Sequence, residues 1–367
     1  MSQPRPSCFS FLWSFRCRCP ESWSPAGLPP GIFEAVGCTC TDLNDWPPQY
    51  QDGYVICNVS TVANSYIALG AARVAEMAEW IGETADAVAY RAVSDRILTT
   101  LRLRLYDRVT GSFSDGLDGP NAAGLAPHPH RSMQAMLFPM MAGVVNETEV
   151  PGMGLAMVKS LRATGMKCSC MGAFWLLEGL YRVGIETAEA ADHALEVMTS
   201  TGQFSWLNMV KQGATCTMET WPSGTAPGSG GTGGTWSHPW CAGPNSAIVR
   251  LLLGVKPIAL GWTRFSFTPQ PSSLVAVNAT VPALVVNRPS AIQVSVIQSP
   301  KSFTATLTVP AGTAARVCLP APHAAPAGVA TALTLDGVAA RAEPTGRMLC
   351  FIDDVGLGKH VMVRVVQ

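Results

Sequence analysis

The sequence predicts a mainly α protein with a β part, in which a ring of helical hairpins is followed by a C-terminal β-sandwich. Apolar residues recur at helical spacing from about residue 58 to residue 253, whereas short β-branched runs dominate after residue 262. A chain of 367 residues with 48% hydrophobic content is long enough for two large cores. We therefore expect an irregular segment over residues 1–42, a helical domain over 43–258 and a β domain over 259–367.

The first 42 residues carry proline, serine, cysteine and tryptophan without apolar periodicity, so we predict no regular structure there. An early arginine precedes a short apolar patch, which is the order found in secretion signals. Ser14 and Arg16 interrupt the patch before an apolar region of the usual length forms. No convincing signal peptide is predicted, and the compartment is not set by the sequence.

The charge balance argues against several classes of partner. Lysine plus arginine and aspartate plus glutamate both number 25, which gives a formal net charge of zero. Such a chain has no long-range field to attract nucleic acid or an anionic membrane surface. No apolar run reaches the 18 residues that a membrane span needs, so a soluble protein is expected. The oligomeric state is not set by the sequence.

Twelve cysteines are scattered along the chain, with five of them in the first 40 residues. Three Cys-x-Cys pairs occur, but they lack the Cys-x-x-Cys spacing and the downstream partners of a zinc site. We therefore predict reduced thiols for the four cysteines of the two N-terminal pairs, and no metal and no cofactor. Metal binding by the N-terminal cysteines is the alternative.

The helical part begins with two paired segments. Residues 58–82 show helical periodicity and end on Gly82, a residue suited to the left-handed position after a helix. Residues 84–107 continue as a second helix, for which Thr84 is the expected N-cap. A joint this short makes the two helices an antiparallel hairpin.

The same pairing recurs further along the chain, in less regular form. The expected helices span residues 130–145 and 149–165, then 171–184 and 187–202, and finally 243–255. Successive hairpins joined by irregular loops indicate a closed or open ring whose loops at one end carry function.

The β part consists of short runs separated by proline, glycine and asparagine. FSFTPQP, LVAVNATVP, ALVVN, AIQVSVIQ, SFTATLTVP, AARVCLP, ALTLDG and HVMVRVVQ predict a sandwich of about eight strands.

Glu219 stands out in the stretch GATCTMETW, because only 14% of the residues in this chain are charged. Small and polar residues before it favour an extended segment that presents the carboxylate to a cavity. Flanking by Met218 and Trp221 is expected to remove water and raise the pKa, which suits a general base near neutral pH. Aromatic rings beside a carboxylate suit a sugar substrate. The alternative is a helix-capping glutamate beside a buried tryptophan.

Two further stretches carry candidate substrate-binding residues. In TWSHPW, Pro239 fixes the backbone so that His238 is presented in a loop, although a structural histidine is equally consistent with these residues. In LNDWPPQYQDGYV, two prolines hold Asp45 and Trp46 in a non-helical loop, as a substrate-facing tryptophan would require. The alternative there is an ordinary turn.

Several motifs occur together and in one order: DWPPQYQDGYV, NVSTVANSYIAL, GATCTMETW and TWSHPWCAGPNSAIVRLLLGVKPIALGWTRFSFTPQP. In this respect the sequence resembles the α-L-rhamnosidases of glycoside hydrolase family 78, over residues 43–320. The resemblance implies an (α/α)6 six-hairpin barrel followed by a β-sandwich, and an inverting hydrolase that acts on a rhamnose-containing carbohydrate. It implies that Glu219 is the general base, that His238 contacts the sugar, and that Trp46 lines the pocket with Asp45 beside it. Trp221 is a weaker extension of the aromatic wall.

The sequence departs from the family pattern at the general acid. The acidic motif that opens the family's barrel, upstream of the Asp-Trp pair, is absent, and residues 1–42 contain only Glu21, Glu34 and Asp42 as acids. About four of the six hairpins are present, so the barrel is expected to be incomplete and the chain to be a fragment or an inactive paralogue. Two alternatives are a catalytically inactive carbohydrate-binding relative and a six-hairpin glycosidase with another sugar specificity.

Overall fold

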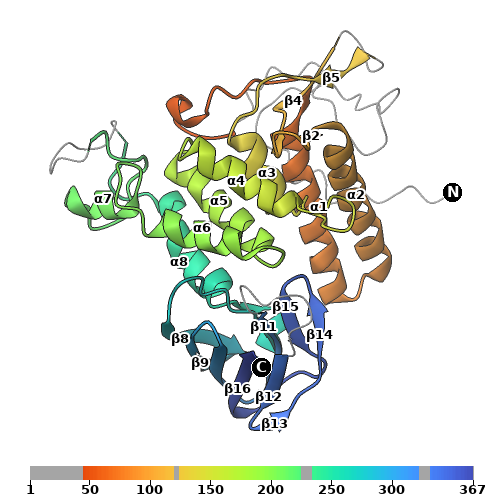
Figure 1. Cartoon of the computed structure of the whole chain (residues 1–367), viewed down its shortest axis with the longest axis vertical. Helices are drawn as coiled ribbons and strands as arrows, with labels where there is room; N and C mark the ends of the chain where they lie inside the picture. The colour runs from red at the N-terminus through yellow and green to blue at the C-terminus, as the bar shows by residue number, and fades with distance from the viewer. Residues whose placement is uncertain (1–43, 120–123, 225–233, 322–330, 367) are drawn as a thin grey trace.

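The computed structural model describes residues 44–119, 124–224, 234–321 and 331–366. A helical part is followed by a β part, and the two lie one above the other in Figure 1. The predictions for residues 1–42, including Glu21, Glu34, Asp42 and the five N-terminal cysteines, lie outside the described residues.

The first hairpin has the predicted form. Helix α1 spans Thr61–Ile81 and helix α2 spans Thr84–Arg104. The Ser60 hydroxyl caps α1 by accepting a hydrogen bond from the Ala63 backbone N–H, and Gly82 ends it in the left-handed conformation with φ of 84°. The predicted capping role of Thr84 is wrong, because Thr84 is already the first helical residue and Glu83 occupies the cap position without a side-chain bond.

Four helices form a continuous row through the helical part. Helix α1 packs against α3 (Gln134–Ala142), α3 against α5 (Cys170–Val183), and α5 against α8 (Gly243–Ala247). Every residue of α3 is buried, since this helix lies between α1 and α5. A π-helical turn, η5 (Ile248–Leu252), continues α8 toward the β part.

The remaining helices flank this row. Helix α4 (Met153–Thr164) packs against α6 (Ala188–Met198), and α6 packs against α5. The short helix α7 (Trp206–Lys211), which the apolar pattern did not predict, follows α6.

Short strands that the sequence did not reveal lie at the N-terminal ends of α1 and α3. They are β1 (Val59–Ser60), β2 (Tyr106–Asp107), β3 (Ser112–Phe113), β4 (Gly116–Asp118) and β5 (Ala126–Pro127). Strand β4 pairs with both β1 and β5, and β2 pairs with β3. The Thr61 backbone N–H donates to the Asp115 carbonyl (2.9 Å), so this small sheet fixes the loops around the start of α1.

The β part consists of two sheets in which most neighbouring strands are antiparallel. Its strands are β6 (Val255–Pro257), β7 (Arg264–Phe267), β8 (Ala276–Val285), β9 (Arg288–Gln298), β10 (Ser302–Val309), β11 (Ala314–Pro320), β12 (Thr331–Leu335), β13 (Val338–Ala339), β14 (Ala342–Thr345), β15 (Met348–Phe351) and β16 (Gly358–Val366). One sheet has the order β13-β12-β16-β10-β9-β8 and the other β14-β15-β11-β7-β6. Strict alternation of burial along β10 shows the one-sided core that the sequence pattern predicts.

The strand count differs from the predicted eight for two reasons. The two runs predicted over residues 274–282 and 283–287 are replaced by the single strand β8 (Ala276–Val285), because Pro282 is tolerated on an edge strand of its sheet. Strands β6, β13, β14 and β15 are too short to give a recognisable alternating pattern.

The structure contains two disulfides that the sequence analysis did not predict. Cys170 is bonded to Cys241, and Cys318 is bonded to Cys350 directly across the β11–β15 ladder. Within the described ranges, no group of three or more His, Cys, Asp or Glu side chains is arranged to hold a metal ion. None of the helices in those ranges has the length and apolar character that a bilayer-spanning segment needs.

We expect the Cys318→Ala, Cys350→Ala double variant to lose about 3 to 4 kcal/mol of unfolding free energy, because the bond closes a loop of sequence separation 32 in the unfolded chain. Urea unfolding without reductant measures the change. Substitution of the exposed, unbonded Cys216 by serine is the control and is expected to have no effect. Equal stability of the double variant and the native chain would show that this bond does not constrain the unfolded state.

Candidate functional site

The loops before α1, α3, α5 and α8 meet at one end of the helical part. Asp45, in the loop before α1, bonds to Gln134 at the start of α3 and to Ser169 at the start of α5. The sulfur of Cys170, the first residue of α5, lies 3.3 Å from the Glu219 carbonyl oxygen. This end of the row therefore gathers the segments that hold the candidate residues.

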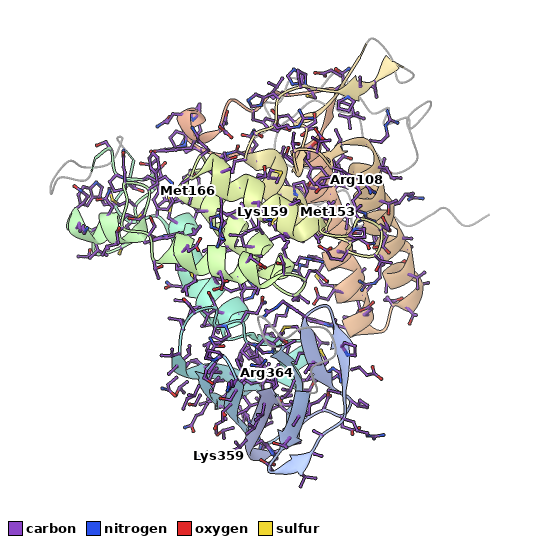
Figure 2. The ribbon with its side chains drawn as sticks, viewed as in Figure 1. Arg108, Met153, Lys159, Met166, Lys359 and Arg364 are labelled. Carbon is purple, nitrogen blue, oxygen red and sulfur yellow. A yellow bond between two sulfur atoms is a disulfide. The ribbon has the colours of Figure 1, made fainter. Side chains whose placement is uncertain are left out.

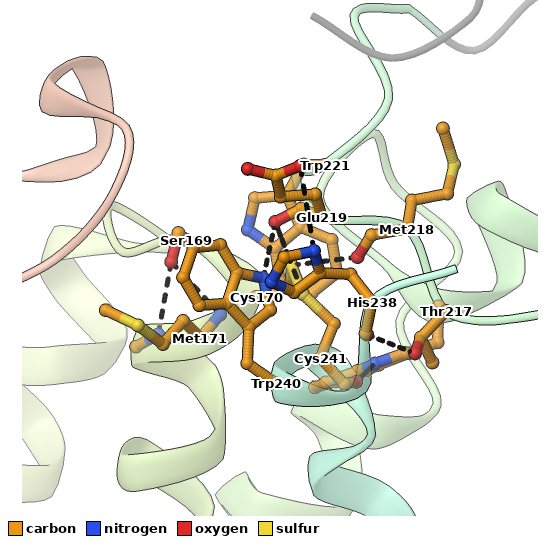
Figure 3. Close-up of a disulfide and its surroundings, with 12 residues drawn as sticks. Ser169, Cys170, Met171, Thr217, Met218, Glu219, Trp221, His238, Trp240 and Cys241 are labelled. Atoms are coloured by element: carbon orange, nitrogen blue, oxygen red, sulfur yellow. Dashed lines mark hydrogen bonds and ion pairs between the residues drawn. A yellow bond between two sulfur atoms is a disulfide. The ribbon is translucent and has the colours of Figure 1, made fainter. Parts of the chain in front are cut away.

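The two stretches around Glu219 and His238 lie side by side. The Glu219 backbone N–H donates to the Thr235 carbonyl (2.9 Å), and the His238 backbone N–H donates to the Thr217 carbonyl (2.8 Å). The Thr217 hydroxyl donates back to the His238 carbonyl (2.7 Å). The lone glutamate and the lone histidine of these stretches thus belong to one structural unit (Figure 3).

The Glu219 carboxylate is fixed through one of its oxygens. Oε2 accepts from the Thr235 backbone N–H (2.8 Å) and lies 3.3 Å from the Thr235 hydroxyl. His238 Nδ1 lies 3.6 Å from the same oxygen and 2.9 Å from the Thr235 hydroxyl. Both side chains are part-exposed, at 20% for Glu219 and 30% for His238, so a ligand can reach them.

The pKa of Glu219 is lowered, and the predicted increase is wrong. The main cause is the hydrogen bond from the Thr235 backbone N–H, with a further contribution from the His238 charge. Met218 and Trp221, which were expected to shield the carboxylate, are 1% and 0% exposed and point into the core instead. The carboxylate is therefore ionised at neutral pH.

Trp221 is a structural residue rather than part of an exposed aromatic wall. Its indole N–H donates to the Cys168 carbonyl (2.9 Å), and its ring packs edge-on against Trp206 with 5.1 Å between centroids. A side chain with no exposed surface does not touch a substrate, so the expected sugar contact is not seen.

Asp45 is also completely buried, and the expected direct contact with substrate is not seen for it either. Its carboxylate accepts four hydrogen bonds, from the backbone N–H groups of Trp46 (2.8 Å) and Ser169 (2.9 Å), from the Gln134 amide (3.0 Å), and from the Ser169 hydroxyl. Burial raises the pKa of Asp45, while these donors act in the opposite direction. Trp46, by contrast, is 42% exposed and available to a ligand.

The segment Cys168–Ser169–Cys170, which we call the α5 anchor, holds both sides of the site. The Ser169 hydroxyl caps α5 by accepting from the Met171 N–H (3.0 Å) while it donates to Asp45. Cys168 holds Trp221 through its carbonyl, and Cys170 is bonded to Cys241 (Figure 3). The Trp46 loop and the Glu219–His238 unit are therefore attached to the same three residues.

Sequence analysis missed a second carboxylate–histidine pair at this end. His130 Nδ1 lies 2.6 Å from Oδ2 of Asp115, whose carboxylate is fully buried and also accepts from the Val55 and Ser132 backbone N–H groups. The His130 side chain is 39% exposed. The available signal was the stretch HPH, which places two of the six histidines of the chain within three residues.

His238 also lines a groove of about 510 Å³ with Trp206, Thr217 and Asn245 among its walls. Glu219 does not line this groove, so the imidazole is the point at which the groove meets the carboxylate–histidine pair.

We expect Asp45→Asn to lower the unfolding free energy by about 2 to 3 kcal/mol. In the native chain the two carboxylate oxygens accept from all the donors around them, whereas the asparagine N–H₂ would face donors and leave them unpaired. Urea unfolding measures the loss. Asp353→Asn, at an exposed position in the β part, is the matched control, with an expected change below about 0.5 kcal/mol. Similar small effects of the two substitutions would contradict the anchoring role of Asp45.

Comparison with known proteins identifies two families along the chain. The bacterial alpha-L-rhamnosidase 6 hairpin glycosidase domain matches residues 34–248, and the bacterial alpha-L-rhamnosidase C-terminal domain matches residues 254–332. No curated protein matches the chain.

Solved structures of similar fold come from bacteria and a fungus. The alpha-L-rhamnosidase from Dictyoglumus thermophilum has a TM-score of 0.62 at 15% identity, over 92% of this chain and 35% of its own. That from Aspergillus terreus has a TM-score of 0.59 at 17% identity, over 89% and 32%. The Streptomyces avermitilis alpha-L-rhamnosidase complexed with L-rhamnose has a TM-score of 0.57 at 20% identity, over 88% and 29%.

The chain thus spans about a third of the length of these structures. Their likeness confirms the predicted fold class, a six-hairpin helical domain followed by a β domain. With a family model matching more than half of its residues, the chain belongs to the bacterial α-L-rhamnosidase six-hairpin glycosidase family.

Proposed function

We propose that this chain carries the general-base side of an inverting glycoside hydrolase that cleaves terminal α-L-rhamnosyl residues. The observation that carries the proposal is the Glu219 carboxylate, which is ionised, reachable by a ligand and fixed beside His238. The family of the chain and the L-rhamnose bound to the Streptomyces avermitilis structure favour rhamnose over other sugars.

Glu219 has one oxygen that is held and one that is available. Oε2 is occupied by Thr235, whereas Oε1 has no hydrogen-bond partner among the described residues. In an inverting reaction, a water held by Oε1 gives its proton to the carboxylate as its oxygen attacks the anomeric carbon. The glycosidic bond breaks on the opposite face of the sugar, and a general acid protonates the leaving oxygen.

Trp46 and His238 supply the sugar-binding surface in this proposal. The exposed indole of Trp46 offers a flat apolar face on which a pyranose ring can stack. Asp45 fixes the position of Trp46, because its carboxylate accepts hydrogen bonds from the Trp46 backbone N–H and from the Ser169 backbone N–H at the start of α5. The ring nitrogen of His238 that does not face Thr235 can bond a sugar hydroxyl.

Two buried carboxylates at this end of the helical part, those of Asp45 and Asp115, are not available as the general acid in this proposal. Asp45 is buried under four donors, and Asp115 is buried against His130. This observation favours a second candidate function, a catalytically inactive carbohydrate-binding relative that retains Glu219 and Trp46. Hydrolysis and sugar binding by the native chain separate the two candidates.

We expect Glu219→Gln to lower kcat for a chromogenic α-L-rhamnoside by a factor of about 10² to 10⁴, because the amide cannot accept the proton of the attacking water. Steady-state kinetics with purified protein measure the loss. Glu83→Gln, at an exposed position between α1 and α2, is the matched control and is expected to leave kcat unchanged.

Two results would contradict this assignment. Full activity of Glu219→Gln would exclude Glu219 as the base. A native chain that binds L-rhamnose in a calorimeter but hydrolyses no chromogenic glycoside would establish the binding relative instead.

The pH dependence of kcat/KM tests the environment of Glu219. Because the pKa of Glu219 is lowered, the acidic limb of the profile is expected below the usual pKa of a glutamate. Protonated His238 contributes to that lowering, so His238→Gln is expected to move the limb to higher pH. His360→Gln, in the β part, is the control. A limb that stays in place or moves to lower pH in His238→Gln would contradict the proposed coupling.

A further inference from the structure

A second recess lies between the helical and β parts, away from the Glu219–His238 unit. It has a volume of about 600 Å³, and its walls come from α1, α5, η5, β6 and β7. Its α5 residues run from Phe174 to Arg182. Arg182 lies about 18 Å along the helix from Cys170, which contacts Glu219, given the rise of an α-helix. The recess is therefore separate from the candidate active site.

The recess is lined by four cationic side chains and one carboxylate: Arg73, Arg182, Arg250, Lys256 and Glu178. Arg250 pairs with Glu178 at 2.8 Å, and Arg73 pairs with Glu76 at 2.8 Å. Arg182 bonds only to a backbone carbonyl, that of Met141 at 3.3 Å, and the Lys256 ammonium has no partner among the described residues. Neither of these two cations forms a close ion pair with a described carboxylate, although Glu178 acts on both at longer range.

Arg182 and Lys256 lie in a concave part of the protein surface. Both side chains are exposed to solvent, yet desolvation by the surrounding protein lowers the pKa of each, and neighbouring arginines lower it further against the opposing effect of Glu178. A cleft lined by one sign of charge attracts the opposite charge more strongly than a convex surface does. The two cations are therefore placed to attract an anion.

We propose that this recess is a binding site for a small polyanion that carries phosphate or carboxylate groups, with Arg182 and Lys256 as its principal contacts. Guanidinium and ammonium donors together are the usual partners of such groups. Arg182 belongs to α5 and Lys256 to β6, so a bound anion joins the helical part to the β part. The site does not depend on the proposed hydrolase activity.

Calorimetric titration of the native chain at low ionic strength tests the proposal, with inorganic phosphate in one arm and citrate in the other. We expect one saturable site for at least one anion, weakened by added salt. Thermal unfolding is expected to shift upward with the same anion, since a ligand of the native state stabilises it. Phosphate alone, or citrate alone, would identify the group that the site recognises.

The variants distinguish a built site from general surface binding. Lys256→Gln and Arg182→Gln are each expected to weaken binding about tenfold or more, whereas Lys256→Arg, which keeps the charge, retains it within a few-fold. Lys359→Gln is the control, because Lys359 lies on the β part away from the helical part (Figure 2). Absence of saturable binding for both anions, or binding that both glutamine variants retain, would overturn the proposal.

Discussion

The site depends on one short segment, the α5 anchor at the start of helix α5. Its Ser169 satisfies a completely buried carboxylate on one side, and its Cys168 and Cys170 hold Trp221, Cys241 and the Glu219 backbone on the other. A buried aspartate is stable only when its oxygens are paired, so the Trp46 loop is confined to the geometry in which Asp45 reaches four donors. The candidate site residues from distant parts of the chain are thereby placed relative to one helix end.

The electrostatics of Glu219 follow from the same arrangement. The stretch around Glu219 pairs with residues 235–238. This pairing directs the Thr235 N–H at the Glu219 carboxylate and brings His238 close to it. Both effects favour the charged form, and together they outweigh the opposing effect of desolvation, which Met218 and Trp221 do not strengthen as expected because those side chains occupy the core. The result is a carboxylate that is ionised over a wide pH range, at the expense of some basicity. In the role proposed for Glu219, proton acceptance from water relies on position more than on an elevated pKa.

The sequence predicted the elements whose pattern is long and regular. The hairpin of α1 and α2 and the strands β9, β10 and β16 have periodic burial over eight or more residues, and local rules suffice for them. Strands β14 and β15 and the disulfides depend on contacts between distant residues, which no local pattern encodes.

Contacts between distant residues also explain which features of the site the sequence did not predict. Glu219, His238 and Trp46 were recognisable by residue type and by family resemblance, but the inward direction of Trp221 and Asp45 is decided by the α5 anchor, about 50 and 120 residues away in the chain. The pKa of Glu219 was mispredicted because it depends mainly on the Thr235 backbone N–H, which the local sequence around Glu219 does not reveal.

Hydrogen–deuterium exchange in a Ser169→Ala variant tests the anchoring role most directly. Ser169 donates to Asp45 and caps α5, and Figure 3 marks no interaction between Ser169 and the Glu219 side chain. If the α5 anchor supports both halves of the site, exchange will accelerate in residues 44–54 and also in residues 217–221 and 235–241. Acceleration confined to residues 44–54, with the Glu219 segment unchanged, would contradict the claim that one helix end holds the two halves together.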